Sequence, residues 1–514
     1  MIGSLAATSN RAPWRPVIKV AFRDTLRVLF CFLSAFEPNA GTAAPNGIVY
    51  HSFTAPTNGT NQDGVNPASG LVLSGGLLCG TTVNGGLRGA GSAYYLAPDA
   101  SAFNAFHSFT NSPDAANPQG NLVNSGSNFF GTTVAGGSSG VGTVFLGKTN
   151  GASSIIRSFP AVSANNATNV GGASPSGALM LSGATLYGTT TAGGTAASGT
   201  IFSLSTNGST FSVLHDFTAL DSNTGTNADG ELPLGGLVLA GNTLYGTASG
   251  GGPGGAGVVF AINTSGGSFT VLHGFTALDA LTATNTDGAF PFSGLAASNG
   301  MLFGTTIAGG HHGKGVVFSI GTNGTWFAVL HHFSATDPLT GTNQEGASPC
   351  APLTLSGGYL YGTASAGGLA SGTIFSVSTD GAQFQLLHTF ATLDASSGTN
   401  TDGALPVAGL LPLGNSLFGV AYSGGPGGAG TVFGVPIPFP PAIITNIVYN
   451  SNGTVTLYFS GGPNSTNIIQ ATGGLTPLPA WVSVSTNVAD ASGAWRLIET
   501  NTANSMRFYR SYAP

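Results

Sequence analysis

Short apolar runs, each ended by a turn signal, recur along most of the chain. A representative stretch contains GLVLA (236–240), TLYGTAS (243–249), GVVFAI (257–262) and FTVLHGF (269–275). Gly-Asn separates the first two runs and Ser-Gly-Gly the last two; other copies use Asn-Gly or Asp-Gly, which accept the positive φ angles of tight hairpins. Each such stretch predicts a four-stranded antiparallel meander.

This meander repeats at intervals of about 58 residues. Its clearest marker is L-Y-G-T or a close variant, whose glycine is found at Gly80, Gly131, Gly188, Gly246, Gly304, Gly362 and Gly419. Four-stranded repeats of this length are typical of β-propellers, in which each sheet buries its faces against neighbouring blades. The sequence therefore predicts an all-β fold with a seven-bladed propeller over residues 45–434.

The first strand of the predicted propeller belongs to the end of a repeat. VYHSF (49–53) matches the fourth run, V-L-H-x-F, but precedes every meander, and no such run follows the last G-T-V-F (430–433). We expect the N-terminal strand to complete the seventh blade, because closing the ring removes open sheet edges. An open β-solenoid, the rival architecture, would have no reason to offset its ends by one strand.

These motifs carry a resemblance to a known family. L-Y-G-T, G-G-x-G-x-G-T-V-F and V-L-H-x-F-x-x-x-D over roughly residues 48–435 resemble the GloVer-type tandem repeat of bacterial surface or secreted proteins. The resemblance implies propeller blades joined to an interchangeable C-terminal anchoring or sorting domain. It implies no enzymatic activity.

The two ends of the chain differ from the repeats. Residues 1–44 hold five basic residues, then the apolar run 28–36 and a small-residue segment ending at Ala44. This order predicts a secretory signal, with a disordered extension as the alternative, and hence a secreted or cell-surface protein. The apolar run is too short to span a bilayer, so we expect no transmembrane segment in the mature chain.

After a Pro-rich linker, 435–441, about six strand-like runs over 442–514 predict a small C-terminal β-sandwich. Its role is open between envelope attachment, glycan contact and folding. Cys79 and Cys350 occupy non-equivalent repeat positions, so no disulfide framework is expected.

Charge is scarce, at 6% of residues, and unevenly distributed. In a meander, the links between second and third strands share one face with the links from each fourth strand to the next blade. We call this face the loop face, and the opposite one, with the tight hairpins, the turn face. Residues 45–435 contain 14 acidic and four basic side chains, and 11 of the acids lie in loop-face links. The predicted field disfavours nucleic acid and favours cations or neutral polar ligands.

We therefore expect the ligand to be a glycan or a protein. We also expect the protein to be monomeric. Candidate ligand-binding acids follow T-N-x in the loops: Asp229, Asp287, Glu345 and Asp402. The earlier loop acids Asp221, Asp279, Asp337 and Asp394 are weak calcium candidates, and no other cofactor is expected. EF-hand spacing is absent, so the alternative is that the Asn and Asp side chains hold turns through local amides.

One loop breaks the repeat. GGHHGKG (309–315) places His311, His312 and Lys314 on the loop face, where histidines could bind a transition metal or act as acid or base. Catalysis would require a carboxylate partner, for which Glu345 and Asp287 are the candidates. The alternative is an exposed loop with no function of its own. The repeated histidines of H-x-F are expected to be hydrogen-bonded structural groups, because a residue present in nearly every blade stabilises blades.

Two functions are consistent with the sequence. The first is a non-catalytic scaffold that binds glycan, protein or cations through the loop face. The second is an extracellular polysaccharide lyase or hydrolase, which should show a deep axial pocket lined by non-repeated charged residues. No nucleophile elbow, phosphate loop, zinc spacing or dinucleotide motif supports the second.

Overall fold

The computed structural model describes residues 18–21, 48–126, 128–437, 443–449, 454–460, 466–472, 482–488, 494–500 and 506–512. The chain divides into two units, one of Ala43–Pro436 and one of Met1–Thr42 with Ile437–Pro514. The described residues form strands and contain no helix that could cross a membrane.

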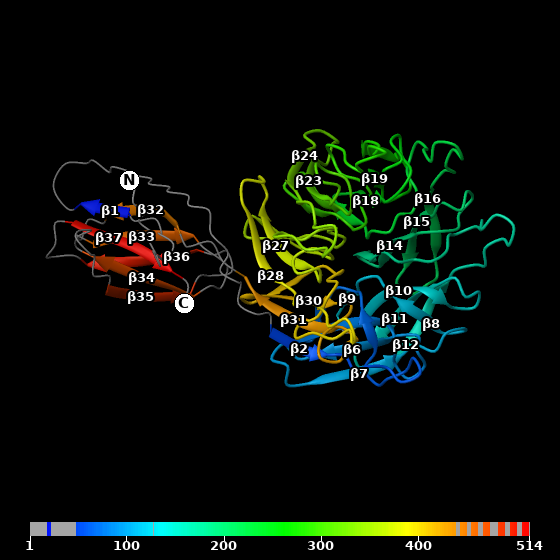
Figure 1. The fold of residues 1–514 in the computed structure, drawn as a ribbon, viewed down its shortest axis with the longest axis horizontal. Helices are drawn as coiled ribbons and strands as arrows, with labels where there is room; N and C mark the ends of the chain where they lie inside the picture. The colour runs from blue at the N-terminus through cyan, green and yellow to red at the C-terminus, as the bar shows by residue number, and fades with distance from the viewer. Residues whose placement is uncertain are drawn as a thin grey trace, which may run out of the picture. The chain divides into compact units, whose positions relative to one another are not determined.

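The larger unit is a seven-bladed β-propeller, as the sequence predicts (Figure 1). Blades 1 and 2 contain β3 (Val65–Pro67), β4 (Val72–Ser74), β5 (Leu77–Asn84), β6 (Ser92–Leu96) and β7 (Phe103–Ser108), then β8 (Ala115–Pro118), β9 (Val123–Ser125), β10 (Asn128–Gly136), β11 (Thr143–Lys148) and β12 (Ser153–Ser158). Blades 3 and 4 contain β13 (Met180–Ser182), β14 (Thr185–Thr190), β15 (Thr200–Ser205) and β16 (Phe211–Asp216), then β17 (Val238–Ala240), β18 (Thr243–Ala248), β19 (Val258–Asn263) and β20 (Thr270–Gly274).

The remaining blades follow the same order around the ring. Blade 5 contains β21 (Ala296–Ser298), β22 (Met301–Thr306), β23 (Val316–Gly321) and β24 (Ala328–His332), and blade 6 contains β25 (Thr354–Ser356), β26 (Tyr359–Ala364), β27 (Thr373–Ser378) and β28 (Phe384–Thr389). Blade 7 consists of β29 (Leu411–Leu413), β30 (Ser416–Ala421), β31 (Thr431–Pro436) and the N-terminal β2 (Ile48–Ser52).

The N-terminal strand is the fourth strand of blade 7 in this sheet order. β2 pairs antiparallel with β31, with Val49 opposite Phe433 and Ser52 opposite Thr431. Phe53, which follows β2, is fully buried and packs against Tyr94 of blade 1 with ring centroids 5.2 Å apart. The chain's first propeller strand therefore contacts both the last blade and the first.

Each blade has one segment that the sequence analysis did not predict. Before the first strand, an X-Pro pair stands with X in the left-handed region of φ, at Asn66, Asn117, Ser174, Leu232, Phe290, Ser348 and Leu405. The N–H of X donates to a carbonyl of the preceding blade, as Phe290 does to Ala256 at 2.8 Å. Proline lacks the N–H that would continue the ladder. Only in blades 1 and 2 does this segment form a strand, β3 or β8, which makes those sheets five-stranded.

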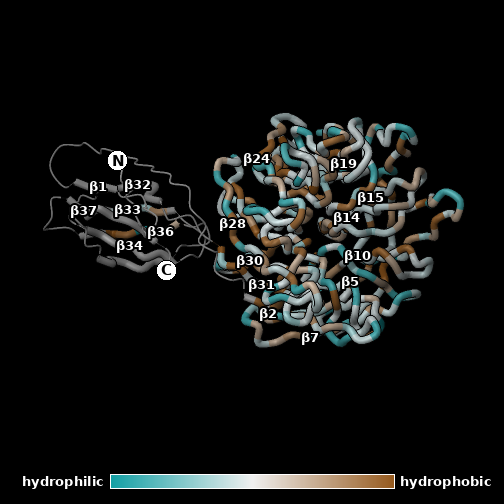
Figure 2. The backbone as a smooth tube through the Cα atoms, in the orientation of Figure 1, coloured by the Kyte–Doolittle hydropathy of each residue, from teal (hydrophilic) through white to brown (hydrophobic). Residues whose placement is uncertain are grey.

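The core lies between the blades. Figure 2 shows hydrophobic residues along the blade strands and hydrophilic ones in many of the outer loops. The largest fully buried side chains are mainly phenylalanines, such as Phe217, Phe260, Phe275 and Phe318. Phe275 of blade 4 packs edge-on against Phe318 of blade 5 at 5.4 Å, so apolar contacts join neighbouring sheets.

The smaller unit contains two antiparallel sheets. One is β32 (Ile443–Tyr449), β33 (Thr454–Ser460) and β36 (Ala494–Thr500); the other is β1 (Ile18–Ala21), β37 (Met506–Tyr512), β34 (Thr466–Thr472) and β35 (Val482–Val488). Phe459 and Trp495 stack on neighbouring strands of the first sheet, 3.9 Å apart. β1 falls within the predicted signal segment, 1–44; the rest of that segment, and most of the linker 435–441, lie outside the described residues.

Candidate ligand-binding loop face

The two kinds of loop-face link are joined by asparagine side chains. In blade 4, the Oδ1 of Asn227 accepts from the N–H of Gly230 in its own link and from Gly252 in the link after β18, at 2.8 and 2.7 Å. Its Nδ2 donates to the carbonyls of Thr218 and Gly230. Asn61, Asn169, Asn285, Asn343 and Asn400 make the corresponding contacts. The prediction that both kinds of link share one face is confirmed.

The H-x-F histidines are paired with acids of the following link. The pairs are His51–Asp63 (3.3 Å), His107–Asp114 (3.8 Å), His215–Asp229 (2.9 Å), His273–Asp287 (3.0 Å), His331–Glu345 (3.3 Å) and His388–Asp402 (2.9 Å). Five of these histidines are hydrogen-bonded to the paired acid, as expected, and His107 contacts the Ser153 hydroxyl instead. The acids Asp229, Asp287, Glu345 and Asp402, expected as ligand-binding candidates, are hydrogen-bonded to histidines.

Each pair is supported by further contacts. Asp287 also accepts hydrogen bonds from the hydroxyl and the backbone N–H of Thr276. Burial alone would raise the pKa of Asp287, but the hydrogen bonds from His273 and Thr276 outweigh it, so its pKa lies below the ordinary value. His273 stacks on Phe327 of blade 5, with ring centroids 3.8 Å apart. The His273–Asp287 pair therefore contributes to the contact between blade 4 and blade 5.

The third blade's link lacks this pair altogether. Arg157 replaces the histidine, and Gly171 stands in the link where the other copies have Asp or Glu. The guanidinium lies over the ring of Phe211, 3.9 Å from its centroid, where other blades stack histidine on phenylalanine. Because the basic and acidic members are replaced together, the pairing itself is the unit that the repeats retain.

The weak calcium candidates are turn residues. Asp279 is exposed, and its Oδ1 accepts from the N–H groups of Leu281 and Thr282 and from the Thr282 hydroxyl. Asp221, Asp337 and Asp394 make the same contacts. These hydrogen bonds lower the pKa of each of the four carboxyls, so they carry charge at neutral pH. In the part of the chain that the structure describes, no three His, Cys, Asp or Glu side chains gather to hold a metal ion.

The fifth-blade histidines lie together but without an acid. His311 stacks on His332 with ring centroids 3.6 Å apart, and its backbone N–H donates to Nδ1 of His332 at 3.3 Å. Within the described ranges, Glu345 and Asp287 contact His331 and His273 rather than His311 or His312. Burial and the neighbouring histidines lower the pKa of His332 to about 4. The structure therefore places His311 against His332. Of these two residues, the sequence had indicated His311 but not His332.

Exposed apolar side chains are a feature of the loop face that the sequence analysis missed. Most of the exposed large apolar residues of the propeller lie in its links: Leu87, Val170, Leu232, Leu281, Phe292, Leu339, Leu369 and Leu405. Leu281 and Leu339 are 96% and 94% exposed, at the tips of neighbouring links. In the sequence, the one sign of these residues is that they fall in the links, outside the alternating apolar and polar pattern of the blade strands.

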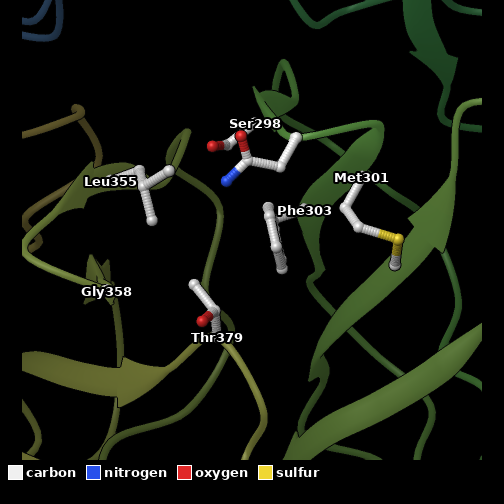
Figure 3. Close-up of a pocket in the computed structure, with 7 residues that line it drawn as sticks. Ser298, Met301, Phe303, Leu355, Gly358 and Thr379 are labelled. Carbon is white, nitrogen blue, oxygen red and sulfur yellow. The ribbon is translucent and has the colours of Figure 1, made fainter.

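A pocket of about 320 Å³ lies between blades 5 and 6 on the turn face (Figure 3). It is lined by Ser298, Asn299, Met301, Phe303, Leu355, Gly358 and Thr379. The Phe303 ring faces the space between the two blades in this view. The lining contains no ionisable side chain, so this pocket is unlike the charged axial pocket expected of an enzyme.

A repeat-family model, described as the Gloeobacter/Verrucomicrobia repeat, matches residues 38–227, 165–343 and 223–433 of this chain. No curated protein matches this chain.

Similar solved structures share little sequence with the chain. A chain of a nidogen/laminin complex is 13% identical, with a TM-score of 0.33 over 58% of this chain and 90% of that one. A Mycobacterium tuberculosis puromycin-hydrolyzing peptidase is 12% identical, with a TM-score of 0.43 over 79% of this chain and 62% of that one. A Vibrio parahaemolyticus oligogalacturonate lyase is 10% identical, with a TM-score of 0.41 over 77% and 99%.

Proposed function

This chain belongs to the Gloeobacter/Verrucomicrobia repeat family, and we propose that it is a secreted or surface-displayed propeller that binds a ligand through its loop face without catalysing a reaction. The ligand classes are protein, glycan or cation. The proposal rests on one observation: exposed carboxylates and exposed apolar side chains occur together in the links of one face.

That combination suits binding. The exposed carboxylates Asp221, Asp279, Asp337 and Asp394 are held in ordered turns, so their positions are fixed before a ligand arrives. Leu281 and Leu339 stand two residues after Asp279 and Asp337. Exposed apolar side chains gathered on one face mark interaction sites more often than scattered ones do.

The same geometry disfavours catalysis as the primary function. Acid–base catalysis requires a titratable group that is free to exchange a proton with a substrate. In the described links, the histidine–acid pairs recur in six blades, and the rings of His51, His215, His273 and His331 stack on a phenylalanine of the next blade, an arrangement that suits a repeated structural contact rather than one catalytic centre.

We extend the proposal to the ends of the chain. β2 keeps the ring closed by pairing with β31. The two sheets of the smaller unit form a sandwich that attaches the propeller to the envelope. Support comes from the β2–β31 register and from the division of the smaller unit's strands into two antiparallel sheets. Secretion is supported by the basic-then-apolar order of residues 1–44.

The test is calorimetric titration of the purified chain with calcium, then with neutral and acidic glycans and with basic and acidic peptides. A loop-face variant, Asp279→Asn with Asp337→Asn, is compared with a turn-face variant, Asp380→Asn. Binding that weakens only in the loop-face variant is the expected result. Glycan cleavage by the wild-type chain, or equal binding by both variants, would overturn the proposal.

A further inference from the structure

One position of the X-Pro segment, which precedes the first strand of each blade, departs from all its counterparts. Two residues after the link acid, or after Gly171 in blade 3, six of the seven blades carry an apolar residue whose backbone pairs with the segment after the second strand. The pairs are Val65–Asn84, Ala116–Ala135, Ala173–Ala192, Ala289–Ala308, Ala347–Ala366 and Ala404–Ser423. In blade 4 the corresponding pair is Glu231–Gly250.

The second member of that pair makes room for the first. A Cβ at Gly250 would lie 3.0 Å from Oε1 and 3.1 Å from Cγ of Glu231. Gly250 does not adopt the positive φ that would require glycine for its backbone. An alanine at this position would require the Glu231 side chain to shift by a few tenths of an ångström, so the glycine leaves room for the glutamate opposite it.

In the described part of the chain, the Glu231 carboxylate has no structural partner. Within residues 128–437, which include all of blade 4, no side chain or backbone group bonds to its carboxylate. Glu231 is half-buried, and burial raises the pKa of its carboxyl. Burial removes water from this carboxylate, and no hydrogen bond or ion pair compensates for that loss. Glu231 therefore does not stabilise the fold.

Two exposed apolar side chains belong to the segment of Glu231 and to the corresponding segment of the next blade. Leu232 follows Glu231 and is 41% exposed; Phe292, which follows the X-Pro pair of blade 5, is 40% exposed. Phe290 of that segment donates its N–H to Ala256, in the same blade-4 link that contains Gly250. Glu231 and the blade-5 segment thus lie against one link.

We propose that Glu231 anchors a lysine or arginine side chain of a polypeptide ligand, with Leu232 and Phe292 receiving the apolar stem and its neighbours. A basic side chain fits because its methylenes pack on apolar surface while its charged end pairs with a carboxylate. The fixed loop-face carboxylates attract such a segment. This inference rests on the proposed binding function of the loop face.

The test uses a randomised dodecapeptide phage library selected on the purified full chain. We expect enrichment of sequences with Arg or Lys beside apolar residues. Affinities of selected synthetic peptides are then measured for wild type, Glu231→Gln, Glu231→Ala, Asp221→Asn and Asp380→Asn. Glu231→Ala restores the residue present in most blades, so folding is not at risk.

The expected loss is about tenfold or more for both Glu231 variants, because a charge-assisted pair is removed. Asp221→Asn, which removes the same charge from the same link, should cost no more than about threefold, and Asp380→Asn on the turn face should change nothing measurable. Equal losses for Glu231→Gln and Asp221→Asn would refute the anchoring role of Glu231. They would indicate that the peptide is attracted by the summed negative charge of the loop face.

Other outcomes separate the two proposals. Selected peptides that lack basic residues but lose affinity in the loop-face variant would retain the binding function and refute the Glu231 anchor. Binding only of glycan or calcium would do the same. Failure to bind any peptide, glycan or cation would refute both.

Discussion

At the residue scale, the glycine of L-Y-G-T marks a close contact. Gly246 lies opposite Phe260 in the register of β18 and β19. A Cβ there would lie 2.6 Å from the Phe260 ring and 2.8 Å from Leu237. The same ring contact is found at Gly188, Gly304, Gly362 and Gly419. The glycine of L-Y-G-T and the phenylalanine of G-T-V-F are therefore one packing unit.

We predict that Gly246→Ala destabilises the propeller by about 1–3 kcal/mol, because the added methyl overpacks a filled core. Gly267→Ala, in the same blade, is the control: its Cβ would meet nothing within 4 Å. That change should be neutral or slightly stabilising. Chemical denaturation of both variants measures the difference, and equal effects would contradict this account of the motif.

His332 illustrates how a loop irregularity can still serve a repeated contact. Its Nδ1 accepts the N–H of His311, as the Ser108 and Ser158 hydroxyls accept from the corresponding loops of blades 1 and 2. A nitrogen that accepts a hydrogen bond carries no proton. This agrees with the low pKa of about 4 for His332.

The pH dependence of stability follows from this pKa. Between pH 6.5 and about 4 the unfolded chain protonates His332 and the folded chain does not, so stability falls as pH falls through that interval. His332→Ser keeps an acceptor and removes the titration. We predict a smaller loss of unfolding free energy from pH 7 to pH 4.5 in the variant, by denaturation at each pH; identical slopes would contradict the assignment.

Sequence reasoning expected the histidines to be structural and offered their acids as candidate ligand-binding residues, but it did not predict that the two would pair. His215 and Asp229 are fourteen positions apart, on a strand and in the link beyond it. Their contact depends on how that link folds back over the blade, which periodicity does not specify. The joint replacement at Arg157 and Gly171 was the available clue, since residues that change together are often in contact.

At the element scale, the number of blades and the order of their strands were predictable because period-two runs and hairpin residues specify local structure. The X-Pro segments were not. Leu232 and Phe290 adopt left-handed φ values, which sequence disfavours for such residues. Their conformation is held by hydrogen bonds to the preceding blade, so it depends on neighbours that exist only in the ring.

The role of β2 can be tested through the phenylalanine that follows it. Phe53 and Phe333 occupy the same repeat position, and each is fully buried. We predict that Phe53→Ala and Phe333→Ala each cost about 3–5 kcal/mol, since each leaves a cavity between two blades. Denaturant melts compare them. A near-neutral Phe53→Ala would show that the N-terminal strand is not part of the closed ring.

At the scale of the whole molecule, the paired acids predict sensitivity to low pH. The folded-state pKa values of Asp63, Asp229, Asp287 and Glu345 lie below their ordinary values of 3.8 and 4.5. Their stabilisation is complete above those values and is lost as pH falls through the folded-state pKa.

We therefore predict that the melting temperature changes little with these groups above about pH 5 and falls steeply below about pH 4. Asp287→Asn should cost about 1–3 kcal/mol at neutral pH, because His273 loses its carboxylate, and should flatten the acid limb of the curve. Scanning calorimetry from pH 2 to pH 7 measures both. An unchanged acid limb in the variant would argue against the pair.

The pairing of β2 with β31 has a consequence for synthesis. About 380 residues separate the two strands, so at a translation rate of about 5–20 residues per second, β2 is made roughly 20–80 seconds before its partner. During that interval its N–H and C=O groups have no native strand to bond. A chaperone or export factor that holds this first strand until the last blade emerges would shorten the period in which newly made chains pair with one another.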